Sequence, residues 1–328
     1  MKQRQLGKDG PMVGEVGFGA MSFGGIFGPT DVATSHRTLD RCLDLGVTHI
    51  DTALIYGPHI SEEVIGAYFR KNPTAEKRFS IATKGGFRIN SRGISNEADF
   101  MRECLEGSLR RLGVEHIDLY YIHRRDQSIP IETVTETLVG FVREGKIGGI
   151  GFSEISPASL ERASKVHHVR AVQSEYSLWS RLPELGMLDA CQRMGTAFVA
   201  FSPLARGVLS NVVLDPKSFT DEFRRNMPRF TEANHAYNMV HIERFKAYAK
   251  SKGWSPSALA LAWVKQKGDH VIPIPGTRTP EHLAENVAAA DINLSADDVR
   301  DIESILPAGF AQGHRYSDEQ QKSVEQYC

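Results

Sequence analysis

The sequence predicts one α/β domain, residues 1–328, in which eight parallel strands close into a (β/α)8 TIM barrel. Short apolar runs alternate with amphipathic helical runs along the whole chain of 328 residues. The apolar runs are continuous, as expected for parallel strands that are covered on both faces. Eight such units favour a closed barrel over an open doubly wound sheet, which usually has about six strands.

Capping signals mark where several helices between the strands begin. Ser156, Ser255 and Thr279 each precede a proline, so a hydroxyl can cap the helix and the proline can occupy its first position. Ser295 and Asp298 have the spacing of a capping box, and with Thr279 they predict extra C-terminal helices. The strands are predicted at residues 16–20, 48–52, 79–83, 117–123, 147–152, 171–174, 197–202 and 271–275.

Two segments depart from the simple repeat. Residues 4–15 contain a Lys-Asp-Gly-Pro turn between short apolar runs, which predicts a hairpin before the barrel. Residues 205–235 form a long polar stretch after the seventh strand, and such loops are uncommon unless they are functional. Within this stretch, residues 222–225 (EFRR) indicate a solvated turn.

Composition excludes several classes of protein. There are 39 Lys and Arg against 40 Asp and Glu, so charge gives no reason to expect nucleic acid or an anionic membrane as a partner. The first residues carry no apolar stretch, and no window approaches the length of a membrane span, so we expect a cytoplasmic protein. Cys42, Cys104, Cys191 and Cys328 are far apart, which favours reduced thiols and no metal site.

Chemistry-bearing side chains end three neighbouring predicted strands. Asp51 ends the second strand and Tyr56 follows it, Lys84 ends the third, and His123 ends the fourth. Each has an ordinary structural explanation when taken alone. The combination of the four is less easily explained by structure alone, because a lysine that points into a barrel needs a counter-charge such as Asp51. A nearby cation should also lower the pKa of a phenol, which would make Tyr56 a usable proton donor.

Three motifs carry a family resemblance: HIDTALIYG (49–57), ATK (82–84) and YYIHRRD (120–126). They resemble the signatures of the aldo-keto reductase superfamily, and SEYSLWSR (174–181) and FSPLARG (201–207) resemble its microbial and plant branch, which includes pyridoxal reductases. The resemblance implies NAD(P)H-dependent reduction of an aldehyde or ketone, with the physiological direction open. Tyr56 would donate the proton, Lys84 would pair with Asp51, and His123 would orient the carbonyl.

The resemblance also implies where a dinucleotide would bind. We expect NADPH rather than NADH, because Arg278 can pair with a 2′-phosphate beside the helix that starts at Thr279. Gly276 and His282 replace cations of better-known relatives, and Glu154 replaces a frequent Asn. The expected contacts are Met21, Asp51, Ser153, Glu154, Gln173, Phe201, Ser202, Pro203, Leu204, Arg206, Gly207, Gly276, Thr277, Arg278, His282, Glu285 and Asn286.

The expected substrate pocket is aromatic with few fixed charges, which favours a bulky or apolar carbonyl compound. The long segment 205–235 is a candidate cover for the cofactor. The candidate pocket residues are Phe23, Phe27, His59, Phe87, Trp179 and Tyr316.

Two other functions remain open at this stage. One is a cofactor-binding regulatory subunit with little turnover, and the other is a Schiff-base lyase that uses Lys84. The expected partner of the reductase is a small-molecule carbonyl substrate, whereas the regulatory subunit would also bind a protein partner. The sequence does not determine the oligomeric state.

Overall fold

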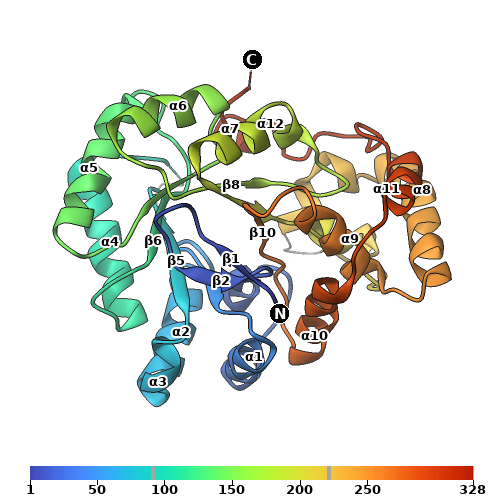
Figure 1. The fold of residues 1–328 in the computed structure, drawn as a ribbon, viewed down its shortest axis with the longest axis horizontal. Helices are drawn as coiled ribbons and strands as arrows, with labels where there is room; N and C mark the ends of the chain where they lie inside the picture. Colours follow the sequence, from blue (N-terminus) through green and yellow to red (C-terminus); the bar gives the residue numbers. More distant parts are fainter. Residues whose placement is uncertain (90–92, 220–222, 328) are drawn as a thin grey trace.

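A computed structural model describes residues 1–89, 93–219 and 223–327, and its centre is a sheet of eight parallel strands (Figure 1). Each strand pairs with the next along the chain, from β3 through to β10. This order confirms the predicted (β/α)8 barrel, with strand ends that differ from the prediction by a few residues. The strands are β3 (Phe18–Gly19), β4 (His49–Asp51), β5 (Ser80–Gly85), β6 (Leu119–Ile122), β7 (Ile150–Ser153), β8 (Ala171–Glu175), β9 (Ala197–Phe201) and β10 (Val271–Pro273).

The first and last strands meet and close the ring. Gly19 forms a parallel bridge with Gly276, and its amide donates to the carbonyl of Pro275 at 3.1 Å. A Cβ at residue 19 would lie 2.8 Å from the carbonyl oxygen of Ile274. Glycine is therefore required here by the close approach of the two backbones.

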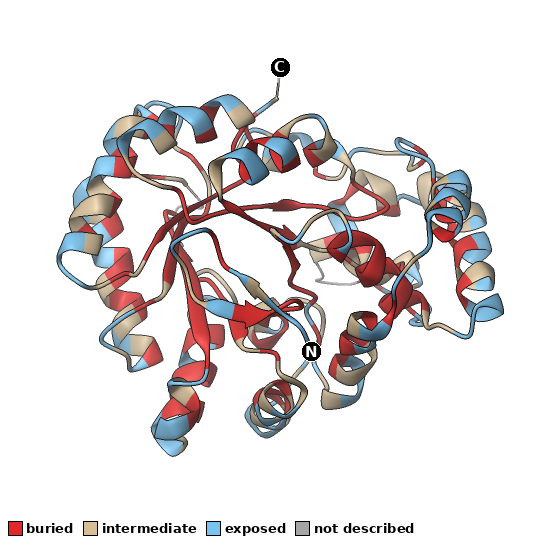
Figure 2. Ribbon diagram, in the orientation of Figure 1, coloured by how far each residue is buried: buried red, intermediate tan, exposed pale blue. Residues whose placement is uncertain are grey.

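Helices surround the barrel, with buried residues on the sides that face the strands (Figure 2). Ser156, Ser255 and Thr279 cap helices as predicted, and Ser295 with Asp298 forms the predicted capping box. The helices are α1 (Val32–Leu45), α2 (Ile60–Lys71), α3 (Pro73–Glu76), α4 (Ala98–Leu112), α5 (Ile131–Arg143), α6 (Pro157–Val166), α7 (Met187–Met194), α8 (Glu232–Ser251), α9 (Pro256–Lys265), α10 (Pro280–Val287), α11 (Ala296–Ile305) and α12 (Asp318–Gln321). None in the described chain is long and apolar enough to cross a membrane.

The predicted hairpin is present and covers the N-terminal ends of the strands. It consists of β1 (Gln3–Gln5) and β2 (Met12–Gly14), which lie across the middle of the view in Figure 1. The guanidinium of Arg4 donates to the carbonyl of Gly268 at 2.8 Å, just before β10. The hairpin thus occupies the N-terminal end of the barrel, and the predicted site residues lie at the C-terminal end.

The segment after β9 is more ordered than the sequence indicated. It folds into short 3-10 turns before α8 begins, at Ala205–Gly207, Pro216–Ser218, Phe223–Asn226 and Pro228–Phe230. Glu222 lies outside the described residues. The expectation of a solvated turn is wrong for Arg224, which is buried over the ring of Phe219 and donates to the carbonyl of Arg206 at 3.0 Å.

Candidate active site

A buried ion pair joins the tips of two neighbouring strands. Asp51 of β4 is in register with Ala82 of β5, so Lys84 lies two residues further on the same face of the sheet. The Lys84 ammonium pairs with one oxygen of Asp51 and donates to the carbonyl of Thr52 at 2.8 Å. The other oxygen of Asp51 accepts a hydrogen bond of 2.7 Å from Gln173. Lys84 is completely buried, and Asp51 is its counter-charge.

Tyr56 and His123 lie beside this pair. The loop after β4 brings the Tyr56 hydroxyl to 3.4 Å from the Lys84 nitrogen. The ring of His123, which follows β6, meets the ring of Tyr56 edge-on at 5.9 Å. Phe87 contacts the same imidazole at 5.0 Å between ring centroids. The structure therefore brings together the four side chains that the sequence singled out.

The prediction that the pKa of Tyr56 is lowered is wrong. Burial raises the pKa of Tyr56, and although Lys84 lowers it, Asp51 raises it again, so the pKa lies above its usual value. The reason is that a buried phenolate loses its hydration, and much of the Lys84 charge is already neutralised by Asp51. Tyr56 consequently retains its proton throughout the neutral range.

The Lys84 ammonium is charged, whereas the His123 imidazole is neutral. Burial lowers the pKa of Lys84, but Asp51 and Tyr56 outweigh burial, so the net pKa is raised and the side chain stays charged. Burial, Arg124 and Lys84 together hold the pKa of His123 well below its usual value, so the imidazole is neutral at pH 7. A permanently charged Lys84 disfavours the Schiff-base lyase, because that chemistry needs a free amine.

The tips of β7 and β8 hold the residues expected to bind a nicotinamide. Ser153 and Gln173 are buried there, and Gln173 also contacts Asp51. Glu154 is fully engaged within the protein, since both of its oxygens pair with Arg315 from the C-terminal tail. One of them also accepts the backbone amide of Glu175 at 2.9 Å. The chain thus uses Glu154 to fasten its tail over the mouth of the barrel.

The turn after β9 has an unusual backbone. Ser202, Ala205 and Arg206 all have positive φ angles, at 48°, 50° and 58°. Non-glycine residues adopt this conformation rarely, and clusters of them are typical of binding sites. The Arg206 guanidinium pairs with Glu175 at 2.7 Å, and Phe201 at the end of β9 is half-buried.

The expected adenosine end is accessible. Gly276, Arg278 and His282 are exposed around the start of α10, where Thr279 caps the helix. The Arg278 guanidinium donates to the carbonyl of Pro29 at 3.3 Å, so it is held near the helix terminus. The remaining predicted contacts in this region are Thr277 and Asn286, which are buried, and Glu285, which accepts from Asn211. Met21, Pro203, Leu204 and Gly207 lie in the segments after β3 and β9.

The candidate pocket residues divide into two groups. Phe27, His59 and Phe87 are half-buried at the C-terminal end of the barrel. Phe23 is only 1% exposed and packs against Phe18, so it belongs to the core and has almost no surface for a ligand.

Trp179 and Tyr316 are both buried, and Tyr316 belongs to the C-terminal tail. Trp179 is 6% exposed and stacks on Phe230 at 6.1 Å. The Tyr316 hydroxyl accepts a hydrogen bond from Arg124 at 3.2 Å. Arg124 was not singled out, although it directly follows His123 in the motif YYIHRRD and that position was the available signal.

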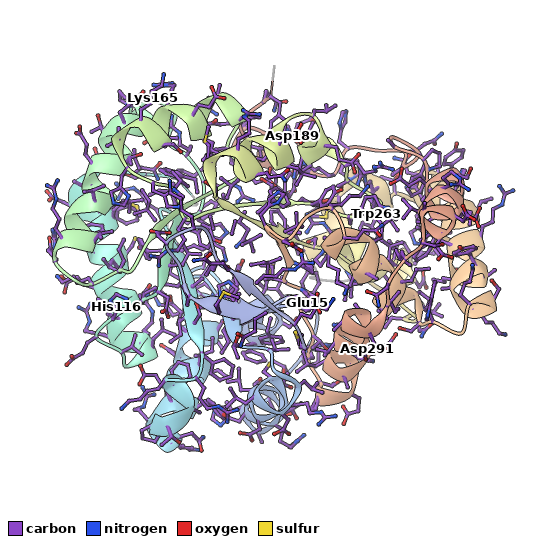
Figure 3. The ribbon with its side chains drawn as sticks, in the orientation of Figure 1. Glu15, His116, Lys165, Asp189, Trp263 and Asp291 are labelled. Atoms are coloured by element: carbon purple, nitrogen blue, oxygen red, sulfur yellow. The ribbon has the colours of Figure 1, made fainter. Side chains whose placement is uncertain are left out.

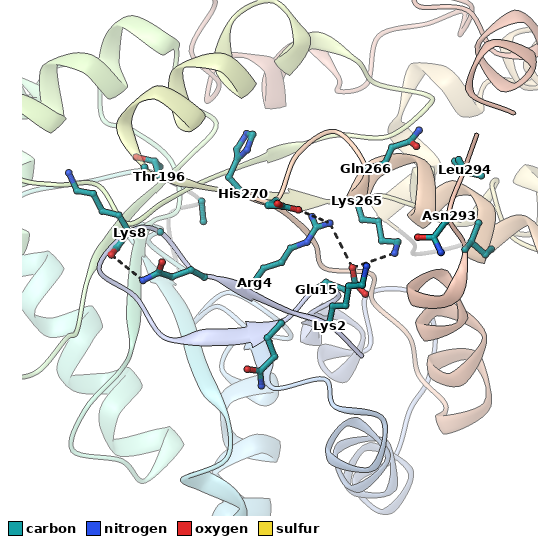
Figure 4. Close-up of a pocket in the computed structure, with 17 residues that line it drawn as sticks. Lys2, Arg4, Lys8, Glu15, Thr196, Lys265, Gln266, His270, Asn293 and Leu294 are labelled. Carbon is teal, nitrogen blue, oxygen red and sulfur yellow. Dashed lines mark hydrogen bonds and ion pairs between the residues drawn. The ribbon is translucent and has the colours of Figure 1, made fainter. Parts of the chain in front are cut away.

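A large cavity lies at the opposite end of the barrel. It has a volume of about 740 Å³ between the hairpin and the strand starts (Figure 4). Arg4, Glu15 and Lys265 line it, and Glu15 lies near the centre of the molecule (Figure 3). None of the candidate site residues lines this cavity, so its size does not make it the active site.

Comparisons with known proteins agree with this geometry. The model of the Aldo/keto reductase family matches residues 15–307. The chain belongs to the aldo/keto reductase family. It is therefore an NAD(P)H-dependent oxidoreductase of carbonyl compounds.

Individual aldo/keto reductases resemble the chain over nearly its whole length. A probable aldo-keto reductase 1 from Glycine max is 37% identical, covering 95% of this chain and 91% of the relative. An aldo-keto reductase yakc [NADP(+)] from Schizosaccharomyces pombe is 35% identical, covering 95% of this chain and 94% of the relative. A glycerol dehydrogenase from Gluconobacter oxydans has a TM-score of 0.84 at 26% identity, with coverage of 96% and 98%.

The aldo/keto reductase site fits a dinucleotide. Ser153 and Gln173 supply buried polar groups at neighbouring strand tips, and the positive-φ turn after β9 presents backbone amides. At the far end, a Cβ at Gly276 would lie 3.0 Å from the carbonyl oxygen of Gly19, so glycine allows the close approach of the two backbones there. These features follow the C-terminal ends of β7 to β10, where barrel enzymes bind their ligands.

Proposed function

We propose that this protein reduces an aldehyde or ketone to the alcohol with NADPH, and that Tyr56 donates the proton. The observation that supports this most directly is the position of the Lys84 nitrogen. It pairs with Asp51 and lies 3.4 Å from the Tyr56 hydroxyl, in the family's order of residues. A bound nicotinamide cofactor supplies the hydride.

Tyr56 acts as the general acid. As hydride reaches the carbonyl carbon, negative charge grows on the carbonyl oxygen, and that oxygen becomes far more basic than a phenolate. A raised pKa of Tyr56 keeps the proton in place until that moment. The buried ammonium of Lys84 then stabilises the phenolate that is left, because it is already fixed at 3.4 Å.

His123 positions the carbonyl. Its pKa is held well below the usual value, first by burial, so the neutral ring carries one N–H donor. A neutral donor orients the carbonyl oxygen without adding a second cation beside Lys84. Phe87 packs edge-on against the imidazole and limits its rotation.

Arg278 supports the choice of NADPH. Its guanidinium is exposed beside the N-terminus of α10, and both features favour a phosphate dianion. The relative from Schizosaccharomyces pombe carries NADP(+) in its name. NADH lacks the 2′-phosphate and would not use this cation.

The test is a panel of aldehydes, ketones and quinones assayed by the loss of NADPH absorbance with the purified protein alone. We expect many turnovers per protein molecule for at least one class of carbonyl compound. Turnover without any partner would also exclude the regulatory subunit. Binding of NADPH without turnover on any member of the panel would contradict the proposal.

A further inference from the structure

Arg124 extends from the residue after His123 toward the tip of the next strand. One of its terminal nitrogens donates to the carbonyl of His123 at 2.7 Å and to the Ser153 hydroxyl at 3.1 Å. The other donates to the Tyr316 hydroxyl at 3.2 Å. The guanidinium therefore links the backbone of His123 to Ser153, which is expected to bind the nicotinamide, and to Tyr316 of the C-terminal tail.

The positive charge of Arg124 has no carboxylate partner in the part of the chain that the structure describes. Among the described residues it forms no ion pair, whereas its neighbour Arg125 pairs with Glu325 at 2.9 Å. Two buried carboxylates at the tips of β7 and β8 are already engaged: Glu154 pairs with Arg315, and Glu175 pairs with Arg206. A half-buried cation without a counter-ion is unfavourable, so a ligand that supplies one is favoured.

Arg124 also has hydrogen-bonding capacity left. A guanidinium carries five N–H donors, and three bonds of Arg124 are made within the described chain. One N–H on Nε and one on the terminal nitrogen that contacts Tyr316 remain. Two donors on one planar group match the two oxygens of a carboxylate.

The charge of Arg124 acts on the reacting groups. After burial, it is the next cause of the low pKa of His123, and it also lowers the pKa of Tyr56 against the larger effect of burial. Together with its hydrogen bond to the His123 backbone, this places the Arg124 guanidinium at the site where the carbonyl compound would bind.

We propose that Arg124 determines substrate specificity by binding the carboxylate of an aldehyde or ketone that also carries an acid group. This inference rests on the proposed function and refines it. It replaces the expectation of an apolar substrate, which came from the aromatic residues alone. Tyr316 and Ser153 hold the guanidinium in place for the carboxylate.

The test uses matched pairs of acids and their methyl esters. Succinic semialdehyde is compared with its methyl ester, and 4-carboxybenzaldehyde with methyl 4-formylbenzoate, at pH 7 with saturating NADPH. In the unmodified protein we expect kcat/KM for the acid of at least one pair to exceed that for the ester by about tenfold or more. Arg124→Gln should lower this acid-to-ester ratio about ten- to hundredfold, the size of a charge-assisted hydrogen bond, mainly through KM for the acid.

Two further variants identify the cause. Arg124→Lys keeps the charge but loses the planar fork, so its ratio should be intermediate. Arg162→Gln removes a surface arginine that pairs with Glu132 at 2.7 Å, and it should leave the ratio unchanged. The affinity for NADPH and the Tm are measured for each variant.

The results separate this inference from the proposed function. Reduction of esters and acids with equal efficiency in the unmodified protein would overturn the inference and leave the proposed function intact. An equal loss for acid and ester in Arg124→Gln, together with weaker NADPH binding, would assign Arg124 to the cofactor instead. Absence of turnover on every carbonyl compound would overturn both.

Discussion

The two ends of the barrel each contain a buried lysine paired with a carboxylate, but the pairs differ in their surroundings. At the C-terminal end, the Lys84 nitrogen contacts Asp51, Thr52 and the hydroxyl of Tyr56. At the N-terminal end, Lys265 lies 3.3 Å from Glu15 and donates to the carbonyl of Ala290. Both lysines are buried, so burial and ion pairing alone do not indicate a catalytic site.

The difference lies in what each ammonium faces. Lys84 faces a phenol that can transfer a proton, whereas Lys265 and Arg4 hold Glu15, which follows the hairpin, and thereby fasten the hairpin to the barrel. One oxygen of Glu15 has no hydrogen-bond partner among the described residues. In the proposed function the first pair serves the reaction, whereas the second fastens the hairpin to the barrel. A buried ion pair points to function only when a reactive group, such as the Tyr56 hydroxyl, lies beside it.

The largest effect is expected at the phenol. Tyr56→Phe removes the proton donor while keeping the ring, so kcat for reduction should fall by about 10²–10⁴-fold. Because the hydroxyl is not expected to hold the dinucleotide, the Kd for NADPH, measured by fluorescence titration, should change little. A variant with near-normal kcat would show that another group donates the proton.

The two lysines provide the most direct test of the comparison. Lys84→Met should lower kcat by about 10²-fold or more, since the phenolate loses its cation. It should also destabilise the fold by about 3–5 kcal/mol, because Asp51 is left buried and unpaired. Stopped-flow reduction and urea denaturation measure the two effects.

Lys265→Met is the matched control. It should lower the free energy of unfolding by about 3 kcal/mol, because Glu15 loses its nearest partner, while kcat stays within about twofold. An equal loss of kcat in Lys84→Met and Lys265→Met would contradict the inference that only Lys84 acts in the reaction.

A smaller effect is expected at the far end of the expected cofactor site. Arg278→Ala should weaken NADPH about tenfold or more and leave NADH nearly unchanged, because only NADPH carries the phosphate that the guanidinium would bind. Titration of both cofactors with the same protein preparation measures the difference. Equal losses for the two would remove Arg278 from cofactor selection.

The smallest effect is expected from pH. The pKa of His123 lies well below its usual value, and that of Tyr56 lies above its usual value of about 10. Neither group changes its charge between about pH 6.5 and pH 9.5, so kcat for reduction should be nearly constant across this window. An acid limb centred near pH 7 would show that His123 titrates normally, and the burial argument would then fail.

The sequence by itself determined the order of the elements and which four side chains meet at the strand ends. Ser156, Ser255 and Thr279 cap helices as predicted because capping involves only neighbours along the chain. Asp51 and Lys84 meet because neighbouring parallel strands end at the same edge. Helix caps depend on neighbours along the chain, and strand-end contacts depend on the order of the strands. A single sequence contains both kinds of information.

Only the tertiary structure decided the charge balance. It showed that burial outweighs Lys84 at Tyr56, which no motif expresses. It also paired Glu154 with Arg315, a residue 161 positions away, and gave Arg124 no ion pair within the described part of the chain. Desolvation and ion pairing depend on every group that surrounds a site in space, and long-range packing sets those distances.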